Sequence, residues 1–125
     1  MRNMSFALTT QQILDQTKTV TRRKGWRFLK PGDLLQPVHK TQGLRKGEKI
    51  TRLVPPIRVV GTSEERLASI YNHVGDVAKE GFLGWTCEQF IKFVCEKCKM
   101  HRDGTVTRIE FEYTEERMAD REKVG

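Results

Sequence analysis

The sequence predicts an α+β domain built around a small mixed β-barrel of about five or six strands, with two or three helices packed on it. Segments rich in Val, Ile, Thr and aromatic residues recur along the chain, and helical patterns interrupt them at irregular places. The two kinds of segment do not alternate as βαβ units, which argues against a doubly wound parallel sheet. The 125 residues suffice for one hydrophobic core and are too few for two.

The first third of the chain predicts two short strands, one helix and one tight turn. "SFAL" (5–8) has a strand pattern, and "TTQQILDQ" (9–16) a helical one in which Thr9 and Gln12 match a capping box. "KTVTRR" (18–23) alternates as an extended segment. "KPGD" (30–33) then predicts a type II turn that leads into the next strand, with a proline that favours an edge or a bulge.

The remainder predicts more strands and two further helices. Residues 49–62 are rich in β-formers and are interrupted at Pro55-Pro56. "TSEERLASIYNHV" (62–74) has a helical apolar face and a second capping-box pattern. "GWTCEQFIKFVCEKCKMHRDG" (84–104) is the clearest helix, with Thr86 and Gln89 as a third box and Gly104 after its end. "TVTRIEFEY" (105–113) closes the domain as a strand, so we expect one domain over 1–114 and a charged tail over 115–125.

The cysteines favour a helix face over a metal centre. Cys87, Cys95, Cys98 and His101 fall on the same helical stripe as Phe90, Ile91 and Val94. Four ligands spread along about 20 Å of one helix, at 1.5 Å per residue, cannot converge on one zinc ion. We therefore expect no metal site and no cofactor. An odd number of cysteines, no apolar leader and no membrane-spanning stretch together predict a cytoplasmic protein that does not bind membranes.

The net charge of +7 is concentrated in one third of the chain. Residues 18–58 hold twelve Lys or Arg against Asp33 and Glu48, a net of +10, whereas residues 59–125 have a net charge of −3. Such asymmetry is typical of a surface that meets a polyanion, and an acidic partner protein is the alternative. The predicted contacts with phosphates or bases are Lys18, Arg22, Arg23, Lys24, Trp26, Arg27, Lys46, Arg52 and Trp85.

Two short segments also offer groups for catalysis. Lys18 precedes Thr21 by three residues in a cationic stretch that lowers the pKa of the lysine, which is one way to obtain a base beside a hydroxyl nucleophile. Glu80 lies before Gly81 in a segment flanked by large aromatic residues. A carboxylate in that setting can act as an acid, a base or a hydrogen-bond acceptor, and it can equally be an ordinary loop residue.

These segments resemble the ASCH domains, which are relatives of the PUA domain. The resemblance runs through "SFALTTQQILDQTKTVTRR", "GWRFLKPGDLLQPV", "IRVV", "VAKEGF" and "RIEFEY". In these segments the chain is similar to compact ASCH proteins of bacteria and phages. It implies a β-barrel with a cleft between barrel and helices, and RNA or nucleotide ligands. In this family an amidohydrolase that deacetylates N4-acetylcytidine uses a Lys, a Thr three residues later and a distant Glu, which Lys18, Thr21 and Glu80 match by position. The resemblance implies that Lys18 is the general base, Thr21 the nucleophile, and Glu80 the proton donor or the partner of the substrate amide.

Three functions follow as hypotheses. The first is an ASCH domain that binds RNA, another nucleic acid or a nucleotide through a basic cleft. The second is a hydrolase, acting on a modified pyrimidine nucleoside or on RNA with Lys18, Thr21 and Glu80. The third is a phage-encoded interaction module whose basic face binds an acidic host protein. The basic loop at residues 40–52 and the Arg22–Lys24 stretch favour a phosphodiester chain at least as much as a nucleoside.

Overall fold

The computed structural model describes residues 1–114 as one five-stranded sheet with short helices around it. The strands are β1 (Arg2–Ser5), β2 (Val20–Arg23), β3 (Leu34–Val38), β4 (Ile57–Arg66) and β5 (Thr105–Tyr113). The helices are α1 (Thr10–Leu14), α2 (Asp76–Lys79) and α3 (Cys87–Cys98), with 3₁₀ turns η1 (Ala7–Thr9) and η2 (Leu67–Asn72). The predicted α+β class is confirmed, and the predicted tail over 115–125 lies outside the described residues.

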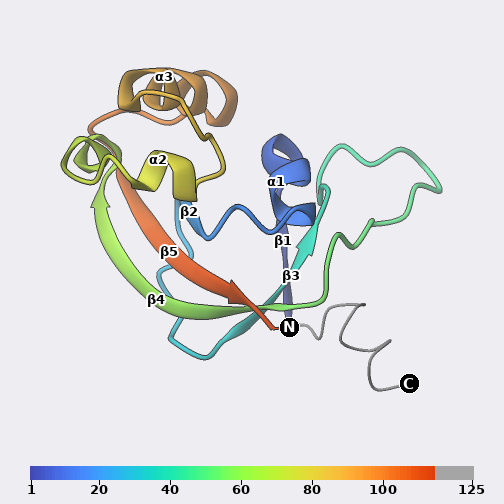
Figure 1. Ribbon diagram of the computed structural model, residues 1–125. Helices are drawn as coiled ribbons and strands as arrows, with labels where there is room; N and C mark the ends of the chain where they lie inside the picture. Colours follow the sequence, from blue (N-terminus) through green and yellow to red (C-terminus); the bar gives the residue numbers. More distant parts are fainter. Residues whose placement is uncertain (115–125) are drawn as a thin grey trace.

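The predicted small mixed β-barrel is present as a curved sheet of five strands that does not close on itself (Figure 1). Its strand order is β1-β3-β4-β5-β2, with β1 parallel to β3 and every other pair antiparallel. The strands β1 and β2 are the two edges, each is only four residues long, and the segment carrying η1 and α1 runs between them. Figure 1 shows the long, curved β4 and β5, with α2 and α3 gathered at the end where β4 finishes and β5 starts.

Strand β4 is longer than the sequence predicts. Thr62 to Arg66 were expected to begin a helix, but they pair with Ile109 to Thr105 of β5, so the expectation is wrong for this segment. Its second capping-box pattern also fails, because η2 has no side-chain cap. Cross-strand pairing with β5 outweighs the local helical pattern, which survives only as the 3₁₀ turn η2.

The other local signals give a mixed outcome. The Pro-Gly turn is present, with Gly32 at φ 96° and the Asp33 N–H donating to the Lys30 carbonyl at 3.0 Å. Helix α3 has the predicted capping box, because Thr86 accepts from the Gln89 N–H and the Gln89 side chain accepts from the Thr86 N–H. The box predicted at Thr9 is not formed. Helix α3 ends at a left-handed Lys99, earlier than the predicted Gly104.

Two apolar clusters hold these elements together. One lies under the sheet and contains Met4, Phe6, Ile13, Leu29, Leu35, Ile57, Val59, Ile109 and Phe111. The other packs the helical end against β5 and contains Leu67, Ile70, Val77, Phe82, Phe90, Ile91 and Val106. Cys87 and Cys95 pack on the second cluster while Cys98 is exposed, so the cysteine stripe is only partly core. Within residues 1–114 no helix is long and apolar enough to cross a membrane.

Candidate nucleotide cleft

A cleft of about 630 Å³ opens between the β2 edge of the sheet, the segment from Ser5 to Thr9, and helix α3. Seven of the predicted site residues line it: Lys18, Thr21, Arg22, Arg23, Lys24, Trp26 and Glu80. Its apolar wall comes from Phe6, Phe82, Phe90, Phe93 and Val94, and Lys97, Cys98 and Met100 add the end of α3. The volume lies within the range of about 300–1,000 Å³ that is usual for pockets that bind small organic ligands.

Lys18 and Glu80 meet in the cleft although 62 residues separate them. The Lys18 ammonium donates to Glu80 Oε1 at 2.9 Å and to the Glu80 carbonyl at 2.7 Å, and both side chains are almost fully buried. Burial is the larger influence and lowers the pKa of Lys18, although the Glu80 charge opposes it. The cleft therefore holds a lysine whose proton is easier to remove than that of an exposed lysine.

Gln12 of α1 fixes both of these residues in place. Its carbonyl accepts from the Thr17 N–H at 3.0 Å and from the Lys18 N–H at 3.3 Å, and its side-chain amide donates to the Gly81 carbonyl at 3.2 Å. Gly81 has φ 104°, and a Cβ there would lie 2.8 Å from the Gln12 Cγ. Only glycine tolerates this approach, so α1 can pack directly on the turn that carries Glu80.

Thr21 lies in the same cleft but is not hydrogen-bonded to Lys18 in the described structure. Its hydroxyl oxygen instead accepts from Arg23 Nε at 3.2 Å, and the side chain is buried. Accepting from a guanidinium leaves the hydroxyl hydrogen of Thr21 available for a separate acceptor. Lys18, Thr21 and Glu80 thus share one cleft, with Lys18 bonded to Glu80 and Thr21 to Arg23.

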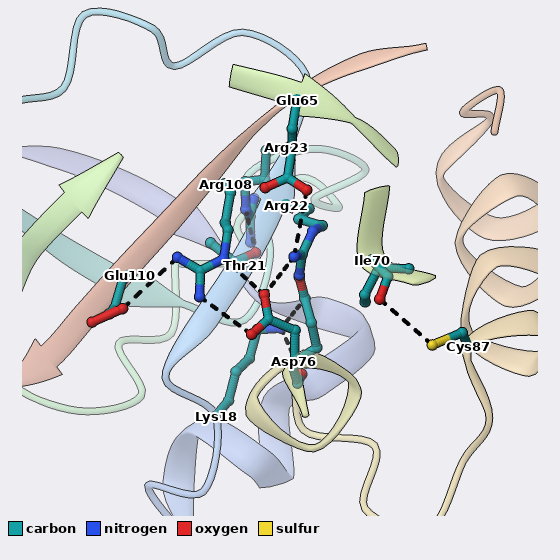
Figure 2. Close-up of polar contacts among 11 residues, drawn as sticks. Lys18, Thr21, Arg22, Arg23, Glu65, Ile70, Asp76, Cys87, Arg108 and Glu110 are labelled. Carbon is teal, nitrogen blue, oxygen red and sulfur yellow. Dashed lines mark hydrogen bonds and ion pairs between the residues drawn. The ribbon is translucent and has the colours of Figure 1, made fainter. Parts of the chain in front are cut away.

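Arg22, predicted from the sequence to contact phosphate, lines the cleft but is buried, and carboxylates already occupy its guanidinium. Its Nη1 donates to Glu80 Oε2 at 3.0 Å. Its Nη2 donates to Asp76 Oδ2 at 2.5 Å (Figure 2). In the ladder between β2 and β5, Arg22 stands directly opposite Arg108, a pairing of like charges that is normally unfavourable. Asp76 resolves it, because Arg108 Nε also donates to Asp76 Oδ2 at 2.7 Å.

As a result, the pKa of the Asp76 carboxyl group is well below its usual value. Desolvation acts to raise its pKa, but the hydrogen bonds from Arg108 and Arg22 prevail and lower it to about 2. Glu65 of β4 adds a third carboxylate, 3.7 Å from Arg22 Nη2. We call these six side chains the buried ion-pair cluster: three cations, Lys18, Arg22 and Arg108, and three carboxylates, Glu65, Asp76 and Glu80.

Three of the six residues in the buried ion-pair cluster, Glu65, Asp76 and Arg108, were not predicted from the sequence. Asp76 precedes Glu80 by four residues, and this spacing places both carboxylates on one side of a helical turn, so a signal for it was present. Arg108 and Glu65 gave none, because only the register among β2, β5 and β4 brings them near Arg22. Within residues 1–114 no three His, Cys, Asp or Glu side chains are placed to hold a metal ion.

Arg23 differs from Arg22 in having no carboxylate partner among residues 1–114. Its Nη2 donates to the Ser5 carbonyl, and its guanidinium lies over the Phe6 ring, 4.6 Å from the centroid. These contacts connect the two edge strands β1 and β2 through a side chain. Desolvation is the main cause that lowers the pKa of Arg23 to about 10. The charge of Glu80 opposes this shift in pKa, but a half-buried cation that is not ion-paired to a carboxylate among residues 1–114 thus lies in the wall of the cleft.

Lys24 and Lys97 extend this positive charge to the cleft mouth. Both are exposed, and Lys24 donates to the Lys99 carbonyl at 2.9 Å. Neither forms an ion pair with a carboxylate in the described part of the chain. We call Arg23, Lys24 and Lys97 the cationic rim. Trp26, half-buried with φ 60°, also lines the cleft, and its ring is tilted against that of Phe28 with centroids 5.6 Å apart.

Four predicted contact residues lie outside the cleft. Arg27 is on the surface and pairs with Glu64 at 3.4 Å, and Lys46 is exposed in the loop between β3 and β4. Arg52 bridges to Val38 through the backbone at the base of that loop. Trp85 lines a second hollow of about 260 Å³ and packs on Phe82 and Phe93, so it contacts the far side of the cleft's aromatic wall.

Comparison with known proteins identifies the fold. No protein-family model and no curated protein matches the chain. Among solved structures, hypothetical protein PH0355 superposes with a TM-score of 0.59 at 14% identity, covering 89% of this chain and 94% of its own. Protein EF3133 from Enterococcus faecalis V583, of family DUF984, gives 0.58 at 13% identity, covering 97% and 80%.

The third similar structure is an ASCH domain from Lactobacillus crispatus JV V101. It has a TM-score of 0.58 and 15% identity, and the superposition covers 89% of this chain and 77% of that one. At such low identity the likeness concerns the fold alone. The resemblance drawn from the sequence segments is therefore confirmed at that level, and the protein has an ASCH-like fold.

Proposed function

We propose that the cleft binds RNA or a nucleotide, with phosphate on the cationic rim and a base against the aromatic wall. The single observation that carries the proposal is Arg23, which is half-buried in the cleft wall and forms no ion pair with a carboxylate among residues 1–114. A partly desolvated cation without an ion-pair partner is unfavourable, and an anionic ligand reduces that cost. Guanidinium groups also match the geometry of phosphate oxygens.

The remaining lining of the cleft fits the same ligand. Lys24 and Lys97 stand at its mouth, and Phe82 and Phe93, which pack against each other with ring centroids 5.4 Å apart, line its apolar wall. Bases stack on such rings in a sequence-tolerant way, typically at about 1–3 kcal/mol per base. The lining thus combines a positive end with an apolar, aromatic end, the two features that a nucleotide requires.

The test is binding of a nine-nucleotide single-stranded RNA of mixed sequence, followed by fluorescence anisotropy over a range of salt concentrations. Lys24→Gln combined with Lys97→Gln should weaken binding and flatten the slope of log K against log salt by about 1.4, at about 0.7 for each phosphate contact. The matched control is Lys30→Gln with Arg66→Gln, which removes the same charge from residues that do not line the cleft.

Two results would contradict RNA binding in the cleft. One is the absence of binding to the RNA and to nucleotides at low salt. The other is an equal loss in the rim variant and its control. If the protein binds no RNA but captures an acidic protein through Lys24 and Lys97, the interaction-module hypothesis gains instead.

A hydrolase is the second candidate, favoured by the presence of Lys18, Thr21 and Glu80 in one cleft. In this scheme Lys18 first loses a proton, which its lowered pKa favours. The Thr21 oxygen then attacks the acyl carbon of an N4-acylated cytidine while its own proton passes to the Lys18 amine. The C–N bond breaks as Lys18 returns that proton to the leaving amine, and water then hydrolyses the acyl–Thr21 ester to the free acid and the Thr21 hydroxyl. Arg23, which donates to Thr21 Oγ1, would stabilise negative charge on that oxygen.

Incubation with N4-acetylcytidine, with release of cytidine measured by chromatography, tests this candidate. We expect Lys18→Ala and Thr21→Ala to abolish release and Thr21→Ser to retain part of it, because serine keeps the hydroxyl. An RNA cleavage assay with the same variants covers the ribonuclease form of the hypothesis. Intact substrate in both assays with the wild-type protein rules the hydrolase out and leaves the binding proposal standing.

A further inference from the structure

A basic loop, residues 39–53, joins β3 to β4 beside the cleft. It contains Lys40, Arg45, Lys46, Lys49 and Arg52 against the single acid Glu48, a net charge of +4. Neither apolar cluster draws a buried residue from it, and only Leu53 at its end packs on one of them. The packing of the domain therefore does not explain why so many cations are present here.

The loop is tied to the wall of the cleft. The His39 N–H donates to the Thr51 carbonyl at 2.9 Å, and Val38 and Arg52 form a bridge, so the two ends of the loop are held together. His39 Nδ1 lies 2.9 Å from Thr10 Oγ1, at the start of α1. Figure 1 shows the loop projecting next to α1. Gln42 lines the cleft itself, so the loop reaches the cleft mouth.

Most of the loop's charge is unpaired. Glu48 accepts from the Arg45 N–H at 2.9 Å and lies 3.7 Å from the Lys40 ammonium, so its carboxylate helps to shape the loop. The side chains of Arg45, Lys46, Lys49 and Arg52 are exposed, and none of them forms an ion pair within the described residues. A row of exposed cations next to a phosphate-binding cleft continues the same electrostatic surface outward.

The cleft is too small to hold more than a short part of a nucleic acid. Its volume of about 630 Å³ is of the size that accepts one small organic ligand. Its inner end is blocked by the Lys18–Glu80 pair, so any longer ligand has to leave through the mouth, where Lys24, Lys97 and Gln42 lie. The bases of a duplex are stacked and paired, whereas a single strand can place an unstacked base inside.

We infer that the ligand is a single-stranded polynucleotide, with one nucleotide inside the cleft and its neighbouring phosphates on the basic loop. The inference rests on the proposed function and extends it, because a free nucleotide would use the cationic rim alone. The loop contacts carry no base-specific information, so they add affinity and salt dependence without adding sequence preference.

The test compares the nine-nucleotide RNA with the four nucleoside monophosphates, by calorimetry at low salt and at increasing salt. The variant Arg45→Gln/Lys46→Gln/Lys49→Gln removes three loop cations and spares Lys40 and Arg52, which help to hold the loop. Its matched control is Lys30→Gln/Arg66→Gln/Lys92→Gln, three exposed cations that do not line the cleft. Circular dichroism checks that both variants are folded.

We expect the wild-type protein to bind the RNA at least about tenfold more tightly than any monophosphate at low salt, through the added phosphate contacts. The loop variant should flatten the salt slope for RNA by about 2, at about 0.7 per phosphate, and leave binding of monophosphates unchanged. The control should change neither.

Four outcomes overturn the inference, and they separate it from the proposed function. Equal affinity for RNA and monophosphates would mean that the cleft binds a single nucleotide and that a polynucleotide is not the ligand. A loop variant indistinguishable from its control would mean the same. Tighter binding of duplex RNA than of single-stranded RNA would contradict a single-stranded ligand. Failure to bind RNA and monophosphates alike removes both proposals together.

Discussion

The buried ion-pair cluster, of which Lys18, Arg22 and Glu80 line the cleft, lies next to the cationic rim, yet the charges of the two groups are in opposite states. In the cluster three cations meet three carboxylates, with every cation within 3.0 Å of an acidic oxygen. In the rim, Arg23, Lys24 and Lys97 meet carbonyls, a hydroxyl or solvent, and no carboxylate among residues 1–114. Neighbouring strand residues 22 and 23 therefore have different roles: Arg22 holds the structure together, and Arg23 is available to an anion.

The difference teaches that position along a strand decides what an arginine can do. Successive side chains of β2 point to opposite faces, so Arg22 reaches α2 and β5 while Arg23 reaches Ser5 and the Phe6 ring. Charges that are desolvated among carboxylates stabilise only as a complete set, because removal of one partner leaves the others buried and unpaired. Charges at the rim remain hydrated in part and tolerate change.

The largest expected effect comes from breaking the cluster at Asp76. Asp76→Asn removes the charge that separates Arg22 from Arg108, and we expect the free energy of unfolding in urea to fall by about 3 kcal/mol. Glu112→Gln, which removes the partner of Arg58 from an exposed pair, is the matched control and should cost under about 1 kcal/mol. Equal losses would show that the buried pairs are no more important than surface ones.

Acid should weaken the same cluster in a defined pH window. The pKa of Asp76 is about 2 in the folded protein and near 3.9 when unfolded, so the unfolded state binds more protons between these values. Stability from this carboxylate is thus present above about pH 4 and is lost as the pH falls towards 2. Urea midpoints measured over this window should fall less steeply for Asp76→Asn than for the wild type. If the urea midpoints of the two proteins fell in parallel with pH, Asp76 would not be the source of the loss of stability in acid.

The smallest effect on stability is expected at the rim. Lys24→Gln combined with Lys97→Gln should leave the free energy of unfolding within about 0.5 kcal/mol of the wild-type value, since both side chains are exposed and without carboxylate partners in the described structure. The same variant is the one expected to weaken RNA binding. If it lost stability as Asp76→Asn does, the distinction between cluster and rim would fail.

The local structures that the sequence predicted correctly are those that depend on interactions between residues close together in the chain. The capping box at Thr86, the Pro31-Gly32 turn and the alternation in β5 each depend on neighbours in the chain. The helix expected from Thr62 failed because β5, about forty residues further on, supplied strand partners for that segment. The sequence also could not predict that the sheet stays open, because barrel closure depends on how β1 and β2 meet across the segment between them.

By itself, the sequence determined the α+β class, the concentration of positive charge in residues 18–58, and the choice of Lys18, Thr21 and Glu80 as residues to examine together. Only the tertiary structure decided which cations are neutralised. It placed Arg22 opposite Arg108 with Asp76 between them, and it left Arg23 in the cleft wall without a carboxylate among the described residues. The physical reason is that pairing depends on separations of about 3 Å between residues more than thirty positions apart, which strand register and helix packing set and composition does not.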